Sequence, residues 1–321
     1  MRGTVVGVLR GGPSNEHEVS LKTGHAILKN LSEEEFTAKD IYIDRQGVWH
    51  IGGRPVAPEV AIRSLDAVII GLHGMYGEDG EVQKLLELHG VPYTGSNSFS
   101  SYLALHKVLA KDKAREHEVL SPQYRFVEEG ADIDEAVREI VRSFLQPVVV
   151  KPVKWGSSVG VSIVGGPAAV GDAIRKVIDG SGGVLVEELI KGKEATVGVV
   201  EGMRGEELYV LPPIEIVPPQ SDFFSYDAKY SGATQEICPG RFSKDESAKL
   251  MELAKTMHNA LGLRHYSRSD FIVSPRGIYF LETNTLPGLT EESLLPKSLA
   301  AVGMKFPDFL SHLVSLALKR T

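Results

Sequence analysis

The sequence predicts a mixed fold, with an α/β region around a parallel sheet at the N-terminus and an α+β region after it. Two observations lead to this prediction. Strand-like and helix-like segments alternate between residues 4 and 89, as in a parallel sheet covered by helices. Further strand-like runs lie between residues 147 and 217, with helical segments before and after them. The length of 321 residues allows a sizeable core and indicates two or three domains.

Residues 1–96 are predicted to form the first domain. Apolar runs, glycine turns and helical periodicity give strands at 4–9, about 38–44 and 66–71, and helices at about 16–31 and 79–89. The segment Val91-Pro92-Tyr93-Thr94-Gly95 makes a short strand and a turn. We therefore place the first domain boundary near residue 96.

The second domain, residues 97–186, is predicted from polar helices through about residue 118 and strands at 147–151 and 161–164. A strand-like run at 184–190 joins it to the third domain, residues 187–321. The third domain contains strands between 194 and 217, a helix at 244–261, a hairpin near 267–284 and helical segments from 291 onward. Residues 218–240 hold no regular pattern, and a loop of this length in a compact domain is usually functional or disordered.

The composition argues against several classes of protein. There are 35 basic and 42 acidic residues, and a net charge of −7 is not that of a general nucleic-acid binder. Cys238 is the only cysteine, so there is no intramolecular disulfide or thiolate metal site, as expected in a reducing compartment. No apolar stretch approaches the ~20 residues that span a bilayer, and no signal-peptide layout is present. We expect a cytoplasmic enzyme or binding protein without nucleic-acid or membrane partners.

Two segments near the C-terminus, 267–273 and 278–284, alternate polar and apolar residues and are predicted to form the strands of a hairpin. The break between them, Pro275-Arg276-Gly277, suits a three-residue loop with glycine at the position that needs positive φ. The loop length fixes which residues of the two strands face each other.

In that register Asp270 faces Glu282 and Arg268 faces Asn284, all on one side of the sheet. Two carboxylates directly opposite each other repel and should destabilise the pair. A hard cation such as Mg²⁺ between them would remove the repulsion, because Mg²⁺ binds oxygen ligands, often one or two carboxylates together with substrate phosphates. The hairpin alone leaves two other interpretations open: Glu282 is a solvated edge charge, or Arg268 neutralises the acids.

Two glycine-containing loops follow strands of the first domain. The first, at 11–14, precedes Glu16, whose carboxylate either stabilises the N-terminus of a helix or binds a cationic group such as an amino-acid ammonium. The second, at 71–80, contains His73 and enough glycine to imply tight turns or close approach of a ligand. His73 is either structural or functional on this information.

In the second domain, Lys151 ends an apolar strand and should need an anionic partner, because burying an unpaired charge is costly. The glycine- and serine-rich segment 153–160 that follows either binds phosphate oxygens or forms a surface turn. Glu187 and Glu194 lie at the predicted domain junction. They belong to a solvated turn, or one of them accepts hydrogen bonds from the ribose of a nucleotide bound between the domains.

Two loops of the third domain are candidates for a role in catalysis. Segment 223–230 combines aromatic residues with a lysine where no secondary structure is predicted, and we expect it to close over a ligand. Segment 285–290 follows the second strand of the hairpin, and its backbone N–H groups could form an oxyanion site.

These motifs, in this order, resemble those of the ATP-grasp superfamily and specifically the D-alanine–D-alanine ligases, and the resemblance covers essentially the whole chain. It implies a three-domain ATP-grasp architecture: an N-terminal Rossmann-like substrate-binding domain, a central ATP-grasp domain, and a C-terminal ATP-grasp domain with the metal and catalytic residues. The motifs that carry it are Glu16-His17-Glu18-Val19-Ser20, His73-Gly74 through Gly80, Lys151-Pro152 with Gly156-Ser157-Ser158-Val159-Gly160, Tyr226-Asp227-Ala228-Lys229-Tyr230, and Glu282-Thr283-Asn284 with Pro287-Gly288.

The resemblance implies that ATP and D-alanine are substrates, that two Mg²⁺ ions are bound with Mn²⁺ as a substitute, and that the chain forms a homodimer. For ATP, the matching residues are Lys107, Lys151 and Lys229 at the phosphates, Glu187 and Glu194 around the adenine and ribose, and Phe223 on the base. The metal ligands are Asp270, Glu282 and Asn284.

For D-alanine, the resemblance implies that Glu16 lies near the ammonium of the first molecule and that His73 contacts the same molecule. The remaining matches are Arg268 and the Gly288 backbone at the oxyanion, Ser293 and Leu294 at the second D-alanine, and a hydrogen-bonded trio of Glu16, Ser157 and Tyr230 that latches two loops over the site.

The implied reaction is formation of D-alanyl-D-alanine through an acyl phosphate, for peptidoglycan precursor synthesis. Trp155 departs from the pattern, because a small or charged residue is commoner there, and the segment after Tyr230 is short. Tyr230 itself favours D-alanine over D-lactate as the second substrate. The alternatives are a related ligase that uses D-lactate or D-serine, and a non-catalytic ATP-binding regulator.

Overall fold

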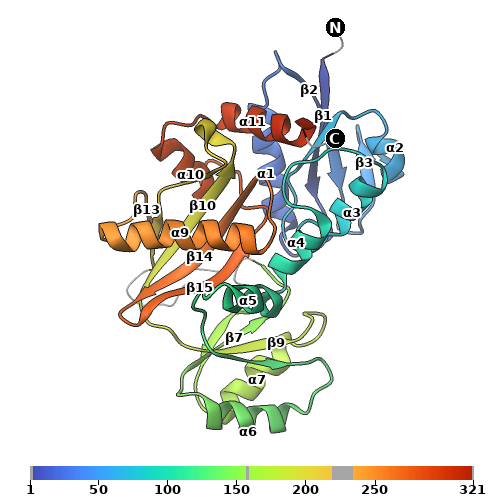
Figure 1. Cartoon of the computed structure of the whole chain (residues 1–321). Helices are drawn as coiled ribbons and strands as arrows, with labels where there is room; N and C mark the ends of the chain where they lie inside the picture. The colour runs from blue at the N-terminus through green and yellow to red at the C-terminus, as the bar shows by residue number, and fades with distance from the viewer. Residues whose placement is uncertain (1–2, 157–158, 219–233, 320–321) are drawn as a thin grey trace.

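The computed structural model describes residues 3–156, 159–218 and 234–319. Within these ranges the chain forms three β-sheets of five, four and six strands, each with helices packed against it (Figure 1). A mixed α/β fold with parallel strands near the N-terminus was predicted from the sequence, and it is confirmed.

The N-terminal sheet has the strand order β4-β3-β2-β1-β5, and β1 is parallel to both β2 and β5. The antiparallel strands β3 and β4 and the short helix α2 were not predicted. The elements of this region are β1 (Thr4–Gly11), α1 (His17–Asn30), β2 (Phe36–Ile43), β3 (Trp49–Ile51), β4 (Arg54–Val56), α2 (Pro58–Ile62), β5 (Ala67–Ile70) and α3 (Glu81–Leu88). Because β1 and β5 are parallel neighbours, the loops that follow them meet at one edge of the sheet.

The glycines of these two loops are required by the backbone. Gly11 has φ 90°, and a Cβ atom there would come within 2.2 Å of the carbonyl oxygen of Ile43. Gly74 has φ 69°, and its Cβ would lie 2.7 Å from Glu16 Oε2. Glycine therefore lets the two loops approach each other and the carboxylate of Glu16.

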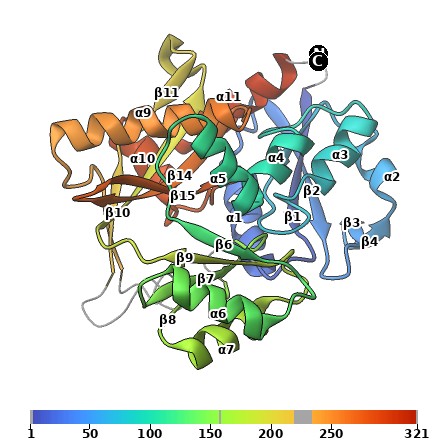
Figure 2. The same ribbon diagram turned by 60° about the horizontal axis from the view of Figure 1, so that its bottom comes forward.

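The central sheet is antiparallel, with the order β6-β9-β7-β8. Its elements are β6 (Tyr124–Val127), α6 (Ile133–Ser143), β7 (Val148–Pro152), β8 (Ser162–Val164), α7 (Pro167–Val177) and β9 (Val184–Glu188). Helices α6 and α7 cover one face (Figure 2) and pack on Val148, Val150, Val184 and Val186. Since side chains alternate along a strand, Lys151 and Glu187 project from the opposite face.

The C-terminal sheet contains the predicted hairpin. Its elements are β10 (Lys193–Glu201), the 3₁₀ helix η1 (Met203–Gly205), β11 (Leu208–Val210), β12 (Ile214–Val217), β13 (Gln235–Ile237), α9 (Lys244–Ala260), β14 (Tyr266–Ser274), β15 (Gly277–Asn284), α10 (Leu294–Ala301) and α11 (Phe306–Lys319). The long helix α9 begins with a capping box of Ser243 and Glu246 and packs on β10 and β14. Helix α11 reaches back to pack against α1 and β5.

Two further helices, α4 (Ser98–Leu105) and α5 (Lys107–Glu116), precede the central sheet in the chain. Their buried side chains share a hydrophobic cluster with Phe271 and Phe280 of the C-terminal sheet. The proposed boundary at 186/187 also falls inside β9, which belongs to the central sheet. The packing therefore favours a division in which α4 and α5 go with the C-terminal sheet, and the three-domain limits stay a proposal.

The hairpin differs from the prediction in its loop. Ser274 pairs with Gly277, so the loop has two residues rather than three. Between Phe271↔Phe280 and Asp270↔Glu282 the register shifts, and Leu281 is the extra residue of this bulge. The bulge offsets the shorter loop, and the predicted pair Asp270–Glu282 is confirmed although the predicted loop is wrong.

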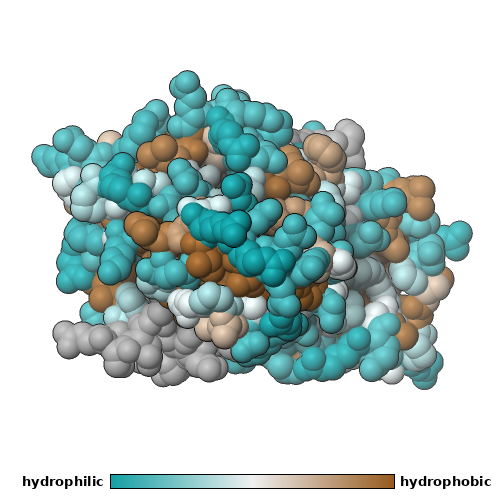
Figure 3. All heavy atoms as spheres, turned by 90° about the horizontal axis from the view of Figure 1, so that it is seen from below, coloured by the Kyte–Doolittle hydropathy of each residue, from teal (hydrophilic) through white to brown (hydrophobic). Residues whose placement is uncertain are grey.

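The surface seen from below in Figure 1 is mostly hydrophilic, and apolar residues form patches among polar ones (Figure 3). Among the described residues, no helix is both long enough and apolar enough to cross a membrane.

We predict that Phe271→Ala will destabilise the fold by about 3–5 kcal/mol, because it leaves a cavity where the ring packs on Phe280 with centroids 5.9 Å apart. Thermal unfolding followed by circular dichroism measures the change. Leu145→Ala is the control, because Leu145 is 94% exposed and should change stability by no more than about 0.5 kcal/mol. Equal midpoints for the two variants would contradict the prediction.

Candidate active site

A cleft of about 950 Å³, open to solvent, lies between the central and C-terminal sheets. The predicted residues that line it are Lys107, Lys151, Glu187, Glu194, Arg268, Asp270, Glu282 and Leu294. A smaller pocket of about 330 Å³ shares Lys107, Trp155 and Glu282 with it and extends to Glu78 and Asn284.

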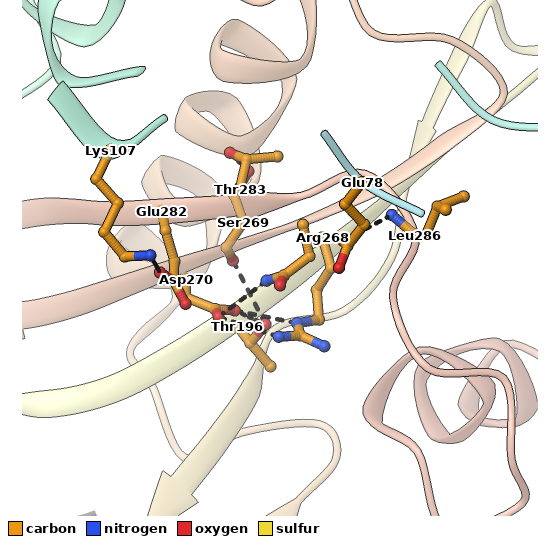
Figure 4. Close-up of polar contacts among 10 residues, drawn as sticks. Glu78, Lys107, Thr196, Arg268, Ser269, Asp270, Glu282, Thr283 and Leu286 are labelled. Carbon is orange, nitrogen blue, oxygen red and sulfur yellow. Dashed lines mark hydrogen bonds and ion pairs between the residues drawn. The ribbon is translucent and has the colours of Figure 1, made fainter. Parts of the chain in front are cut away.

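The hairpin places Asp270 and Glu282 in the lining of this cleft, and Figure 4 shows the polar contacts around them. Arg268 donates to Asp270 through Nε and Nη2, each at 3.1 Å, and Asn284 Nδ2 donates to Asp270 Oδ2 at 3.3 Å. Lys107 Nζ lies 3.1 Å from Glu282 Oε2. The repulsion expected between the two facing carboxylates is thus offset by one cation on each. Neutralisation by Arg268, one interpretation of the sequence, accounts for Asp270 only.

The helix α5 contributes a second lysine that the sequence analysis missed. Lys111 lies one turn after Lys107 and its side chain is 0% exposed. Its Nζ is 2.8 Å from Glu187 Oε1, while Lys151 Nζ is 2.6 Å from Glu187 Oε2. The anionic partner expected for Lys151 is therefore Glu187. The i,i+4 spacing of the two lysines on a helix was the signal available in the sequence.

Burial and charge act against each other in this group. Burial lowers the pKa of the Lys111 ammonium to about 8, although Glu187 beside it raises the value. Burial by itself would raise the pKa of Glu187, but Lys111 and Lys151 hold it below its usual value. The carboxylate is therefore charged at neutral pH, and it has a lysine on each oxygen.

The glycine loop at 71–80 of the N-terminal sheet meets the C-terminal region at residue 286. His73 Nδ1 donates to the carbonyl oxygen of Leu286 at 3.0 Å, and Thr23 Oγ1 lies 2.7 Å from His73 Nε2. Glu78 accepts from the N–H of Gly74 at 2.8 Å and from that of Leu286 at 3.3 Å. Both ring nitrogens of His73 are engaged within the protein, which favours a structural role; its contact with substrate stays a prediction.

Burial also sets the protonation of this group. It lowers the pKa of His73, so the ring is neutral at pH 7. Burial and the neighbouring Glu16 raise the pKa of Glu78 to about 8. Glu78 was not singled out in the sequence, because a charged residue in a glycine-rich loop gives no sign of burial.

Glu16 lies where three loops meet. It stands at the N-terminus of α1 but makes no capping hydrogen bond with its side chain, and it is buried. A Cβ atom on Gly156 would lie 2.8 Å from Glu16 Oε2, so Gly156 approaches the same carboxylate as Gly74 does. Stabilisation of the helix is thus the weaker of the two interpretations of Glu16.

The segment after the hairpin forms a compact turn. Thr290 donates its backbone N–H to Ser293 Oγ at 3.1 Å, and Ser293 precedes α10. A Cβ atom on Gly288 would be 2.7 Å from the same Oγ, so Gly288 and Ser293 are neighbours. Leu294 follows at the wall of the cleft. Four predicted residues, Ser157, Phe223, Lys229 and Tyr230, lie outside the described residues.

Asp270 and Glu282, together with Asn284, are the predicted ligands of a metal ion. Within the ranges that the structure describes, no group of three or more His, Cys, Asp or Glu side chains is placed to hold a metal ion. Two carboxylates and an amide oxygen, from Asp270, Glu282 and Asn284, suit Mg²⁺ that arrives with phosphate oxygens as its other ligands. These side chains fit a nucleotide-bound magnesium rather than a metal held by protein alone.

Comparison with families of known sequence gives two matches. The family described as D-ala D-ala ligase C-terminus matches residues 116–315. The family described as D-ala D-ala ligase N-terminus matches residues 5–59 and 52–96. Together these matches cover most of the chain.

Curated relatives give the same result. The D-alanine--D-alanine ligase of Geobacter sulfurreducens is 39% identical over 324 residues, covering 99% of this chain and 96% of the relative. The enzyme of the same name from Carboxydothermus hydrogenoformans is 36% identical over 319 residues, with 98% of each covered.

Among solved structures, the VanG D-Ala:D-Ser ligase from Enterococcus faecalis has a TM-score of 0.86 at 30% identity, covering 98% of this chain and 100% of that one. The D-alanine--D-alanine ligase from Bacillus anthracis complexed with ATP has a TM-score of 0.81 at 28% identity, covering 99% and 98%.

Proposed function

The chain belongs to the D-alanine–D-alanine ligase family and has its ATP-grasp fold, and from this premise we propose which residues carry out each step of its reaction. It is an ATP-dependent ligase that joins two D-alanine molecules, a reaction that supplies peptidoglycan precursors. The observation that carries the assignment of residues is the cleft in which Arg268, Asp270 and Glu282 face Lys107 and Lys151.

In the proposal, ATP occupies the cleft with its phosphates near Lys107 and Lys151. Both lysines are less than a tenth exposed yet line the cleft, and a buried ammonium is favoured when an anion is close. Lys229, which lies outside the described residues, is assigned to the same phosphates. Glu187 and Glu194 are assigned to the adenine and ribose, and Phe223 to the base.

We assign Asp270, Glu282 and Asn284 as ligands of two Mg²⁺ ions, with Mn²⁺ as a substitute. Bound Mg²⁺ would neutralise phosphate oxygens and favour phosphoryl transfer. Arg268 and Lys107, which pair with the two acids, limit the repulsion between the carboxylates when no cation lies there.

In the first step Glu16 holds the ammonium of the first D-alanine, and a carboxylate oxygen of that molecule attacks the γ-phosphorus of ATP. The bond from this phosphorus to the bridging oxygen breaks, ADP leaves and an acyl phosphate forms. Lys107 and Lys151 offset the negative charge of the transferring group. A latch of Glu16, Ser157 and Tyr230 would exclude water from the acyl phosphate.

In the second step the amine of the second D-alanine, once it has lost a proton, attacks the acyl carbon. Arg268 and the Gly288 N–H donate to the oxyanion of the tetrahedral intermediate, after which the bond from carbon to the phosphate oxygen breaks and phosphate leaves. Ser293 and Leu294 are assigned to the second D-alanine, and their place beside Gly288 supports this role.

A ligase that uses D-serine or D-lactate at the second position is the main alternative. It is supported by the likeness to a D-Ala:D-Ser ligase at 30% identity. The curated relatives at 36–39% identity are named for D-alanine at both positions, and we favour that substrate. A non-catalytic ATP-binding regulator is disfavoured, because such a protein has no need of Arg268, Asp270, Glu282 and Asn284 together.

A cytoplasmic location and a homodimer complete the proposal. Both rest on the family to which the chain belongs, and the first also on its small-molecule substrates.

The substrate is tested by ADP release with D-alanine as the only amino acid, with the product identified by mass. We expect turnover and a product of the mass of D-alanyl-D-alanine. Addition of D-serine or D-lactate should not give a mixed product as the main one. Release of ADP only when one of these is present would contradict the proposed second substrate.

The metal assignment predicts that Glu282→Gln raises the Mg²⁺ concentration for half-maximal activity by about tenfold or more, because a neutral amide replaces a charged ligand. A titration of activity with MgCl₂ measures this. Glu292→Gln is the control, since the Glu292 side chain is 91% exposed. Undiminished activity and an unchanged Mg²⁺ requirement in Glu282→Gln would show that Glu282 is not a ligand.

The oxyanion assignment predicts that Arg268→Met lowers kcat by roughly 10²–10³ while the KM for ATP changes much less, because the lost interaction acts on the second step. Arg268→Lys should regain only part of the activity, since it lacks the planar fork. Arg276→Met, at the other end of the same hairpin and 57% exposed, should retain activity. A change in the KM for ATP without a fall in kcat would refute this role of Arg268.

A further inference from the structure

Lys111 is a buried cation that the proposed reaction does not use. Its side chain is 0% exposed, and it is absent from the described lining of the cleft, which includes Lys107, Lys151 and Glu187. A lysine is rarely so buried unless it is paired. Its partner is Glu187, which also pairs with Lys151, so one carboxylate lies between two ammonium groups.

The geometry divides the two lysines by role. Lys111 Nζ is 2.8 Å from Glu187 Oε1, on the side enclosed by the protein. Lys151 Nζ is 2.6 Å from Oε2 and lines the cleft. Two cations on one anion leave an excess of positive charge, and the cleft is the side on which a ligand can meet it.

A pair of one carboxylate and one lysine would behave differently. If Glu187 were matched by Lys151 alone, their charges would cancel in a poorly solvated place. A phosphate would then approach a neutral pair, and it would have to compete with Glu187 for the same ammonium. The attraction of a buried cation for phosphate depends on the charge that its neighbours leave uncompensated.

We propose that Lys111 is a positioning residue for ATP: it offsets the charge of Glu187 and fixes its carboxylate, so that Lys151 keeps its orientation and its positive charge for the phosphates. The inference rests on the proposed function, because it takes Lys151 as a phosphate contact. Lys111 itself touches no substrate.

A purely structural role is the alternative. Helix α5, which carries Lys111, packs against β15 and α9 of the C-terminal region, while Glu187 belongs to the central sheet. The ion pair therefore also joins two parts of the fold. A structural role predicts a loss of stability without a specific effect on ATP affinity.

The test is ATP binding to the full chain, with Mg²⁺ and without D-alanine, measured by isothermal titration calorimetry. Lys111→Met should weaken binding by about tenfold or more, the range expected for loss of one charge-assisted interaction. Lys111→Met combined with Glu187→Gln removes one charge of each sign and leaves that of Lys151. Because Glu187 is itself assigned to the nucleotide, Glu187→Gln is the reference for this double variant: adding Lys111→Met to it should weaken ATP binding by no more than about threefold.

Matched variants separate charge from packing. Lys113→Met lies on the same helix at a side chain that is 35% exposed, and it should bind ATP like the wild type. Lys111→Arg keeps the charge and should retain most of the affinity. Melting temperatures are recorded for every variant. In any buried ion pair, removing the second charge can restore stability lost with the first, so only an effect on ATP affinity supports the proposed role.

Two results would overturn the inference: ATP affinity unchanged in Lys111→Met, or a double variant that binds ATP as weakly as the product of the single effects predicts. Should Lys111→Met fail to fold, the test is carried by the double variant compared with Glu187→Gln and by Lys111→Arg compared with the wild type. Binding more than about tenfold weaker in both comparisons would overturn the inference. A wild-type chain that binds no ATP would refute the proposed function itself.

Discussion

The pairing of buried charges across the cleft is the interaction on which the rest of the site depends. Three of the carboxylates that line the cleft pair with cations: Asp270 with Arg268, Glu282 with Lys107, and Glu187 with both Lys111 and Lys151. A buried charge without a partner costs several kcal/mol or shifts its pKa until it is neutral. The hairpin, the central sheet and helix α5 must therefore meet in one register for any of these charges to be tolerated.

Helix α5 connects the C-terminal hairpin with the central sheet through two of these ion pairs. Lys107 and Lys111 lie one helical turn apart, so they project from one face of the helix. Lys107 pairs with Glu282 of the hairpin, and Lys111 pairs with Glu187 of the central sheet. One turn of helix thus fixes the distance between the proposed metal ligands on one side and the proposed phosphate lysine on the other.

The sequence predicted those parts of this arrangement that follow from local pattern. Alternation along 267–273 and 278–284 gave the facing pair of Asp270 and Glu282, and the cost of burying a charge gave an anionic partner for Lys151. The bulge at Leu281 could not be predicted, because the alternation of polar and apolar residues does not show where one strand carries an extra residue. The identity of the partner, Glu187, depends on how β7 and β9 align in the sheet. The burial and pairing of Lys111 depend on how α5 packs. Such alignments are set by tertiary packing, which local sequence pattern does not show. The strands β3 and β4 were missed for another reason, because three residues are too few to show a strand pattern.

The N-terminal sheet is tied to the C-terminal region at Leu286, two residues after Asn284 of the hairpin that carries the proposed metal ligands. Its N–H donates to Glu78 and its carbonyl accepts from His73, so one peptide segment is held at both polar groups by the loop 71–80. The loop that carries His73 is thereby held beside the proposed metal ligands. The central sheet meets the same hairpin through the ion pair Arg276–Glu188, whose arginine is exposed, and such a pair exchanges partners more easily than buried backbone hydrogen bonds do. The proposed metal ligands and the loop that carries His73 are therefore held together by buried hydrogen bonds, whereas the central sheet contacts the hairpin through a more exposed ion pair.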